Sequence, residues 1–127
     1  MNKSIVITAA LFGMIAVIAG AFGAHGLKTM IAPDQLQIWH TAVEYNFYHV
    51  FALLFLSVLA KNKTSWTTAA YYLFTFGIVF FSGSLYLLAC RDILNLKASV
   101  IGPITPIGGL LFIGGWASLA VAASKSK

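Results

Sequence analysis

The sequence predicts an all-α fold: an integral membrane four-helix bundle in which neighbouring helices run antiparallel. Hydrophobic residues make up 60% of the 127 residues and charged residues only 9%, whereas a soluble domain usually has about 25% charged residues. The apolar residues form four runs, and a helix needs about 20 such residues to cross the hydrocarbon core. We therefore expect one transmembrane domain, residues 1–127, with helices at roughly 4–25, 36–60, 66–90 and 99–123.

The first run could be a signal peptide, because it has a basic start and an apolar core, and Ala19-Gly20-Ala21 offers small residues. It is long for a signal sequence and the rest of the chain is also apolar, so we expect a retained helix. The second run carries polar residues in its first half. The third ends at Cys90, which is the only cysteine, so an intrachain disulfide is excluded.

The fourth run begins with Gly102-Pro103-Ile104-Thr105-Pro106, part of the stretch GPITPIGG. Such a stretch breaks a regular helix, and in lipid it is tolerated only when it is buried in protein or lines a cavity. It could form a short re-entrant turn. The simpler interpretation, which we prefer, is that the prolines open the fourth helix, since proline suits the first helical turn.

Lysine and arginine mark the ends of the runs and predict the orientation of the chain. Four spans place both termini on one side of the membrane, with Lys3, Lys61, Lys63, Lys125 and Lys127. The other side has Lys28, Arg91 and Lys97. The positive-inside rule therefore predicts that both termini lie in the cytoplasm. We expect the protein in the cell inner (cytoplasmic) membrane. The basic residues form no single water-facing patch, so we expect membrane lipid, and no nucleic acid, as a partner.

Small residues recur every fourth position in two of the predicted helices. In lipid such stripes let helix backbones approach closely. They permit packing within the chain or packing between subunits of a homo-oligomer, which we also expect. The stripes are Ala16, Gly20 and Ala24 in the first helix, and Gly114, Ser118 and Ala122 in the fourth.

Polar residues inside the spans gather in the half of the membrane away from the termini. Glu44 is the only acid within a span and lies about 7–8 Å below Trp39, at 1.5 Å per residue. Because a carboxylate facing hydrocarbon costs several kcal/mol, we expect Glu44 to look into the bundle. The expected polar cluster, which binds a ligand or stabilises the bundle, comprises His25, Thr41, Glu44, Tyr45, Tyr48, His49, Ser82, Ser84, Arg91 and Thr105.

Helical periodicity gives the second helix two faces. At 100° per residue, the residues of the expected polar face fall within one arc of about 140°. That face comprises Thr41, Glu44, Tyr45, Tyr48, His49 and Ala52, and the opposite, lipid-facing arc comprises Val43, Phe47, Val50 and Leu54.

Glu44 has three interpretations. It could pair with Arg91 or His25 and lock the bundle, it could belong to a ligand, ion or proton site, or it could be catalytic. A zinc site would need three or four converging ligands. Glu44 and His49 are five residues apart and diverge on the helix, although His40 and Glu44 could converge. We expect no metal, and the chain has no CxxCH motif for attaching haem, so we expect no cofactor.

Several segments together resemble a known family. They are Gly20–Gly26, WHTAVEYNFYH at Trp39–His49, Phe81–Tyr86, Gly102–Gly109 and Gly115-Trp116. The chain resembles the domain-of-unknown-function 423 family of small bacterial membrane proteins, whose animal relatives are called transmembrane protein 256. The resemblance covers almost the whole chain and implies four membrane helices, but no activity. The residues that match its motif positions are His25, Trp39, Glu44, Tyr45, His49, Ser82, Ser84, Thr105 and Pro106, whereas His40 is not carried over.

The sequence favours a non-enzymatic membrane component that supports envelope integrity or a partner protein. The alternative is a protein that binds or transports a lipid, small amphiphile, cation or proton at the polar cluster around Glu44. An enzyme acting on a lipid-soluble substrate is the least favoured reading, because no phosphate loop, GxSxG elbow or HExxH motif is present.

Overall fold

The computed structural model describes residues 1–126, so Lys127, which was counted above with the basic residues, lies outside it. Helices account for the regular structure of these residues. They are α1 (Lys3–Ala24), η1 (Leu27–Thr29), α2 (Pro33–Leu59), α3 (Ser65–Gly77), η2 (Ile78–Ser82), α4 (Gly83–Ala89), α5 (Arg91–Leu94), α6 (Ala98–Ile101) and α7 (Ile104–Lys125). Four stretches are long and apolar enough to cross a membrane: Lys3–Ala24, Pro33–Leu59, Ser65–Ala89 and Ala98–Lys125. The predicted all-α class with four spans is confirmed.

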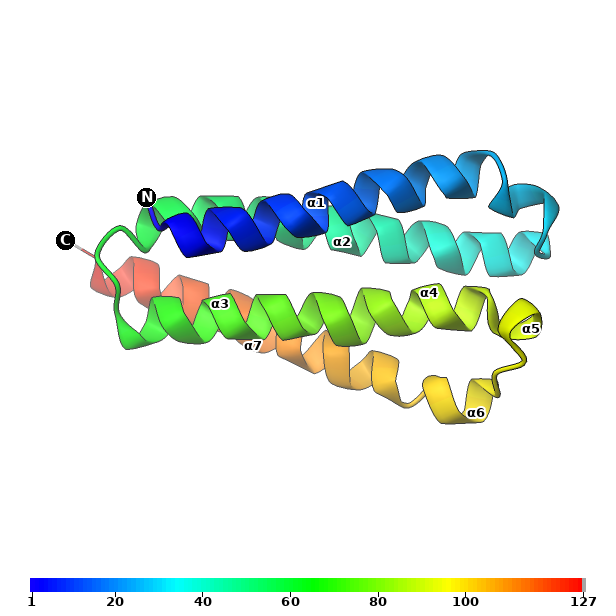
Figure 1. Ribbon diagram of the computed structural model, residues 1–127. Helices are drawn as coiled ribbons and strands as arrows, with labels where there is room; N and C mark the ends of the chain where they lie inside the picture. The colour runs from blue at the N-terminus through cyan, green and yellow to red at the C-terminus, as the bar shows by residue number, and fades with distance from the viewer. Residues whose placement is uncertain (127) are drawn as a thin grey trace.

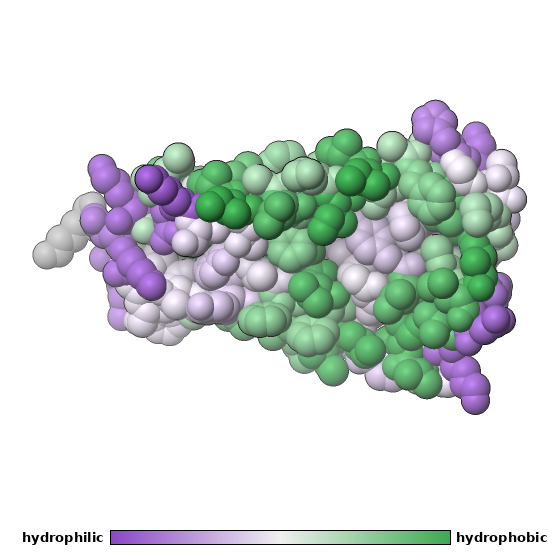
Figure 2. Space-filling model, in the orientation of Figure 1, coloured by the Kyte–Doolittle hydropathy of each residue, from purple (hydrophilic) through white to green (hydrophobic). Residues whose placement is uncertain are grey.

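The helices form two antiparallel pairs, and both termini lie at the same end of the bundle (Figure 1). α1 packs along α2, and the third span, made of α3, η2 and α4, packs along α7. α2 joins the pairs because it also contacts α3, η2 and α4. Hydrophilic surface gathers at the two ends, and hydrophobic surface covers much of the length between them (Figure 2). This distribution is typical of a membrane span.

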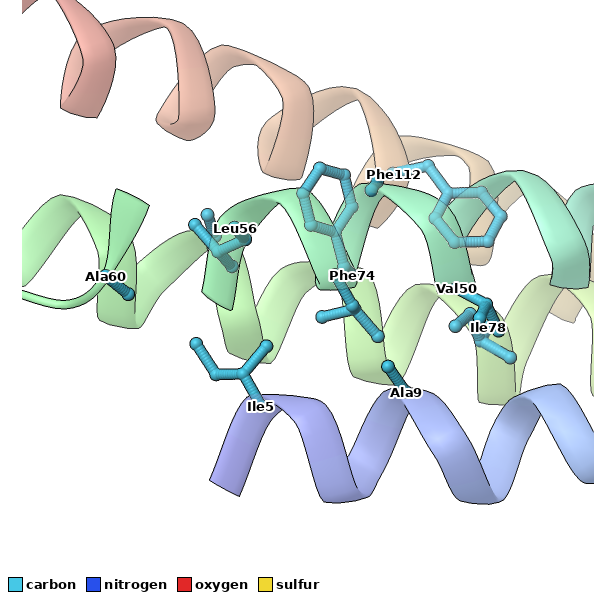
Figure 3. Close-up of a cluster of buried hydrophobic side chains, with 11 residues drawn as sticks. Ile5, Ala9, Val50, Leu56, Ala60, Phe74, Ile78 and Phe112 are labelled. Atoms are coloured by element: carbon cyan, nitrogen blue, oxygen red, sulfur yellow. The ribbon is translucent and has the colours of Figure 1, made fainter. Parts of the chain in front are cut away.

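The core lies in the half of the bundle that holds the termini, and Phe74 and Phe112 are its largest members. Ile5 and Ala9 of α1 point toward the side chains contributed by the other three spans (Figure 3). Gly77 and Gly115 make room for the two rings. A side-chain carbon at Gly77 would collide with Phe112, and one at Gly115 would lie 2.7 Å from Phe74 Cδ1.

The small-residue stripes are used inside the chain. Ala16 is fully buried, and a side-chain carbon at Gly20 would meet Val43 of α2 at 3.6 Å. On α7, Ser118 and Ala122 are buried as well. Most members of the stripes therefore pack within the chain, whereas Ala24 at the end of α1 is exposed.

Two helix starts follow from proline. α2 begins at Pro33, three residues before the predicted start, and its first turn is capped by the Gln35 side chain, which accepts from the Ala32 N–H at 3.2 Å. In the fourth span α6 ends at Ile101 and α7 restarts at Ile104, with Pro103 as its N-cap residue and Pro106 in its first turn. The prolines thus open a helix, and the re-entrant turn is not adopted.

The third span contains one feature that the sequence did not predict. Residues Ile78–Ser82 form a π-helical turn between α3 and α4. Gly108 of α7 packs directly against its backbone, because a side-chain carbon there would collide with the Phe81 amide nitrogen. π-helical turns inside α-helices are rare and occur frequently at functional sites.

Candidate functional site

The buried polar side chains predicted as one cluster lie instead in separate hydrogen-bonded groups. The first group surrounds His49, which is 4% exposed. Its Nδ1 lies 2.7 Å from the Tyr45 carbonyl oxygen and its Nε2 lies 3.1 Å from the Trp116 indole nitrogen. A carbonyl only accepts and an indole N–H only donates. His49 is therefore the neutral tautomer with its proton on Nδ1, and both ring nitrogens are occupied.

The second group joins α2 to the third span around Asn46, which is 1% exposed. The Asn46 side-chain amide donates to the Tyr86 hydroxyl at 3.0 Å, and its Oδ1 is buried with no hydrogen-bond partner in the described chain. Nearby, the Ser82 hydroxyl donates to the Ala42 carbonyl at 2.8 Å. Ser82 was predicted from the sequence as a site residue, whereas Asn46 and Tyr86 were not. The available signal was the amide of Asn46 within the polar first half of α2.

The third group connects α4 to the first turn of α7. The hydroxyls of Ser84 and Thr105 lie 2.6 Å apart, and the Ser84 hydroxyl also lies 2.9 Å from the Phe81 carbonyl. Both hydroxyl residues were predicted as site members, and the structure brings them together. They hold the start of α7 against the third span just beyond the π-helical turn.

Trp39 fixes the C-terminal end of α1, which lies away from the chain termini, to α2. Its indole N–H donates to the Ala19 carbonyl at 2.8 Å. Its ring packs edge-on against Phe22, with centroids 6.0 Å apart, and lies 4.7 Å from the Tyr86 ring. Gly23 makes this contact possible, since a side-chain carbon there would lie 2.7 Å from Trp39 Cδ1.

Glu44 does not look into the bundle, and this expectation from the sequence is wrong. Its side chain is exposed on the outer surface of α2, next to Tyr48, which is 52% exposed. Within residues 1–126 the carboxylate has no hydrogen bond or ion pair, and the neighbouring Thr41 hydroxyl donates to the Gln37 carbonyl at 3.1 Å.

The inward face of α2 is made of other residues. It contains the small residues Ala42 and Ala52, the aliphatic residues Val50, Leu53 and Leu56, and the polar residues Asn46, His49 and Ser57. Val50, which was predicted to face lipid, is thus buried. Close packing against α1 and the third span decides which face turns inward, and it outweighs the cost of placing one carboxylate outside.

Two predicted members lie apart from the interior groups at the end of the bundle away from the termini. His25 is exposed at the end of α1. The Arg91 guanidinium donates to the Leu88 carbonyl at 2.9 Å, so it caps its own helix instead of pairing with Glu44. At the same end, the Gln35 side chain donates to the Asp92 carboxylate and ties α2 to α5. The hydrogen bond between Gln35 and Asp92 was not predicted.

Cys90 ends α4 at this same end and is partly buried. Burial disfavours the charged thiolate and raises the pKa of the Cys90 thiol. In residues 1–126 no group of three or more His, Cys, Asp or Glu side chains is arranged to hold a metal ion.

A groove of about 500 Å³ opens on the outer surface between α2, η2 and α7. His49 and Phe112 stack at its base, with ring centroids 3.5 Å apart and ring planes 5° apart. Its walls are apolar and aromatic. The lining residues are Tyr45, Tyr48, His49, Phe81, Gly109, Phe112, Ile113 and Trp116.

Known proteins resemble this chain over nearly its full length. The family model described as "Protein of unknown function (DUF423)" matches residues 19–109. The chain belongs to the DUF423 family. The DUF423 chain is 44% identical over 126 residues to the UPF0382 membrane protein YwdK of Bacillus subtilis, covering 97% of this chain and 98% of the relative.

Staphylococcal relatives are equally similar to this DUF423 chain. The UPF0382 membrane protein SAB0533 of Staphylococcus aureus is 45% identical over 123 residues, and SSP2132 of Staphylococcus saprophyticus is 43% identical over 123 residues. Both alignments cover 97% of this chain, and 97% and 98% of the relatives, respectively. No solved structure matches the DUF423 chain at a significant level. The chain is therefore a membrane protein of a family whose description assigns no activity.

Proposed function

We propose that this protein is a non-enzymatic component of the bacterial cytoplasmic membrane that acts through a protein contact on the outward face of α2. The observation that carries the proposal is the exposure of Glu44 at membrane depth. Through this surface the protein would bind a partner protein. It would thereby support that partner or the integrity of the envelope.

The depth of Glu44 follows from the packing of α1 on α2. Side-chain carbons at Gly13 and Gly20 would meet Val50 and Val43, respectively, each at 3.6 Å. In this antiparallel register Glu44 lies beside residue 19, which is five residues before the end of α1. At 1.5 Å per residue, Glu44 is therefore about 7–8 Å deeper than the end of α1. A carboxylate at such depth is costly in hydrocarbon and normally has a partner. A second protein on this face would supply one.

The interior supports a non-enzymatic role. General acid–base catalysis needs a side chain free to exchange a proton with a substrate, and nucleophilic catalysis needs a nucleophile within hydrogen-bond reach of a base. His49 uses both ring nitrogens on Tyr45 and Trp116. The hydroxyl of Ser82 is engaged by a backbone carbonyl, and that of Ser84 by a carbonyl and Thr105. These groups stabilise the bundle, and none of them faces the groove as an unpaired base.

We propose that the chain is oriented in the membrane with both termini in the cytoplasm. It rests on the excess of lysine at the end that holds the termini, according to the positive-inside rule. The outward polar face of α2 then belongs to the half of the membrane away from the cytoplasm.

Photo-crosslinking in living cells tests the proposed contact. A photoreactive residue at Phe51 of α2, which is 61% exposed, should give a discrete protein adduct. The same residue at Val17 of α1, which is 60% exposed, is the matched control and should give none. Glu44→Leu should weaken the adduct from position 51. Adducts of equal yield from both helices, or none from α2, would overturn the proposal.

A second candidate function is binding of a membrane amphiphile in the groove. The groove is lined mainly by aromatic rings and opens beside the exposed hydroxyl residue Tyr48. Gly109 lines it, and a side-chain carbon there would meet only the Phe81 ring, at 3.9 Å. Gly109→Leu should therefore fill the groove.

Native mass spectrometry of the purified protein tests this second candidate. A lipid retained by the unmodified chain should be lost from Gly109→Leu. It should remain with Leu110→Phe, which adds bulk at a position that is 69% exposed and does not line the groove. Equal retention by both variants would remove this candidate.

A further inference from the structure

The outward face of α2 carries a continuous seam. Its members follow one another at alternating spacings of three and four residues, which is the pattern that packs two helices side by side in a left-handed coil. All but Thr41 are exposed, and Thr41 is half-buried. We define the α2 seam as Thr41, Glu44, Tyr48, Phe51, Phe55 and Val58.

The α2 seam changes in chemistry along its length. The half away from the termini has a hydroxyl, a carboxylate and a phenol at Thr41, Glu44 and Tyr48. The half nearer the termini has only Phe55 and its apolar neighbours. Lipid solvates the apolar half but not the polar half. Polar side chains that hydrogen-bond between helices are one of the forces that associate membrane helices.

We infer that the partner on this face is a second copy of this chain, in a parallel two-fold pair in which Glu44 of each copy accepts hydrogen bonds from tyrosine hydroxyls of the other. The inference rests on the proposed function, since it identifies the partner of the same surface. Two copies inserted with the same topology present the same residues at the same depth. Polar then meets polar and aromatic meets aromatic along the whole seam, as a two-fold interface requires.

Knobs-into-holes packing identifies the donors. In such packing each seam side chain inserts among four residues of the facing helix. For Glu44 of one copy these would be Thr41, Glu44, Tyr45 and Tyr48 of the second copy. The two Glu44 side chains then face each other as acceptors, so the tyrosine hydroxyls have to serve both. Tyr45 and Tyr48 are 37% and 52% exposed, and within residues 1–126 their hydroxyls have no hydrogen-bond partner.

The face therefore holds both an acceptor and donors, and within residues 1–126 these groups form no hydrogen bond with one another. This self-complementarity favours a second copy over a different protein.

The outward face of α1 lacks this complementarity. The outward face of α1 is aliphatic, with Ile7, Val17 and Ile18 each at least 60% exposed. Lipid is as apolar as these side chains, so burying them against another chain gains little. Most of the striped small residues of α1 and α7, which could have driven close association, pack within the chain, among them Ala16, Ser118 and Ala122.

Disulfide cross-linking in liposomes that contain only this protein tests the inference. Single cysteines are placed from position 44 to position 55 in a Cys90→Ser background and oxidised. Covalent dimer should peak at 44, 48, 51 and 55, since a disulfide needs Cα atoms about 4.4–6.8 Å apart. A cysteine at Ile18 of α1, which is 66% exposed, is the control and should stay monomeric. A maximum at other positions, or no dimer from any seam position, would overturn the inference.

Energy transfer between labelled copies gives the affinity. Tyr48→Phe removes one hydroxyl from the α2 seam and should weaken association about threefold to twentyfold, the range expected for interhelical hydrogen bonds in membranes. Tyr72→Phe on α3 is the matched control, because Tyr72 is 53% exposed against 52% for Tyr48. Equal effects of the two variants would contradict the inference.

Glu44→Leu should weaken association, whereas Glu44→Gln, which is neutral and both donates and accepts, should retain it. Equal affinity of Glu44→Leu and the unmodified chain would contradict the inference.

The fate of the proposed function can be separated from that of the second copy. If position 51 is photo-crosslinked in cells to a different protein and the liposomes hold only monomers, the proposed function stands and the second copy is wrong. If no adduct forms at position 51 in cells and no dimer forms in liposomes, both are wrong.

Discussion

His49 of α2 and Phe112 of α7 stack face to face, with their ring centroids 3.5 Å apart and their planes 5° apart. The two helices have few other contacts, and α2 packs mainly against α1 and the third span. The stack, with the hydrogen bond from Trp116 to His49, is therefore the principal link between α2 and α7. It also closes the base of the outer groove.

Removing the imidazole should destabilise the bundle. His49→Ala leaves a cavity beside Phe112 and the Trp116 N–H without its acceptor, so we expect a loss of about 2–4 kcal/mol in the free energy of unfolding. His40→Ala, at a half-buried position of the same helix, is the control and should change it by about 0.5 kcal/mol or less. Both are measured by SDS titration in mixed micelles, and equal losses would contradict the role given to His49.

The pair formed by Asn46 and Tyr86 should show strong coupling. Tyr86→Phe alone leaves the buried Asn46 amide without its partner and should cost about 1–3 kcal/mol. The double variant Asn46→Leu/Tyr86→Phe replaces both polar partners by apolar groups and should be close to the unmodified protein in stability. A double-mutant cycle in the same micelles measures the coupling. Additive losses would mean that the two side chains do not stabilise each other.

Adjacent glycines of α7 should respond differently to alanine. Gly108→Ala places a methyl group against the backbone of the π-helical turn at Phe81, and overpacking of this kind costs about 1–3 kcal/mol. Gly109→Ala meets the Phe81 ring at 3.9 Å, an ordinary contact, and should be neutral or stabilising by about 1 kcal/mol, because alanine favours the helix. Thermal unfolding in detergent measures both. If the two variants melt together, the contact between α7 and the π-helical turn is wrong.

Much of the fold could be predicted from the sequence. Apolar runs of sufficient length specify the four spans, and Pro103 and Pro106 specify where α7 begins. The π-helical turn could not be predicted, since its residues are ordinary helix formers and only its contact with Gly108 distinguishes it.

The candidate site was predicted in part. Ser84 and Thr105 meet as expected, and His49 is buried as expected. The predicted rotation of α2 about its axis was wrong because it was based on the single carboxylate of Glu44. The small and aliphatic side chains at Ala42, Leu53 and their neighbours set it in the structure. Asn46 was missed because it lies opposite Glu44 on the helix.

Cys90 offers a test of the orientation. If the termini are cytoplasmic, a membrane-impermeant maleimide should label Cys90 in right-side-out vesicles but not in inside-out vesicles. The pKa of the thiol is raised by burial, so less thiolate is present at neutral pH than in a free thiol. Labelling should be slow at neutral pH and accelerate as the pH rises past the ordinary thiol range.

The control for this labelling is Ser126→Cys in a Cys90→Ser background, which moves the thiol to the exposed C-terminal end. It should be labelled only in inside-out vesicles. The reverse pattern for the two cysteines would place the termini outside the cytoplasm and refute the orientation.

The central claim is that α2 turns Glu44 outward and Asn46 inward, and spin labels at these positions test it most directly. Labels are attached to cysteines at 44 or 46 in a Cys90→Ser background, with one chain per lipid nanodisc. The account predicts a mobile label accessible to dissolved oxygen at 44 and an immobile, inaccessible label at 46. With two chains per disc, a label at Phe51, which is 61% exposed and leaves Glu44 and Tyr48 in place, should become immobile. An immobile label at 44 and a mobile label at 46 in single chains would contradict the account.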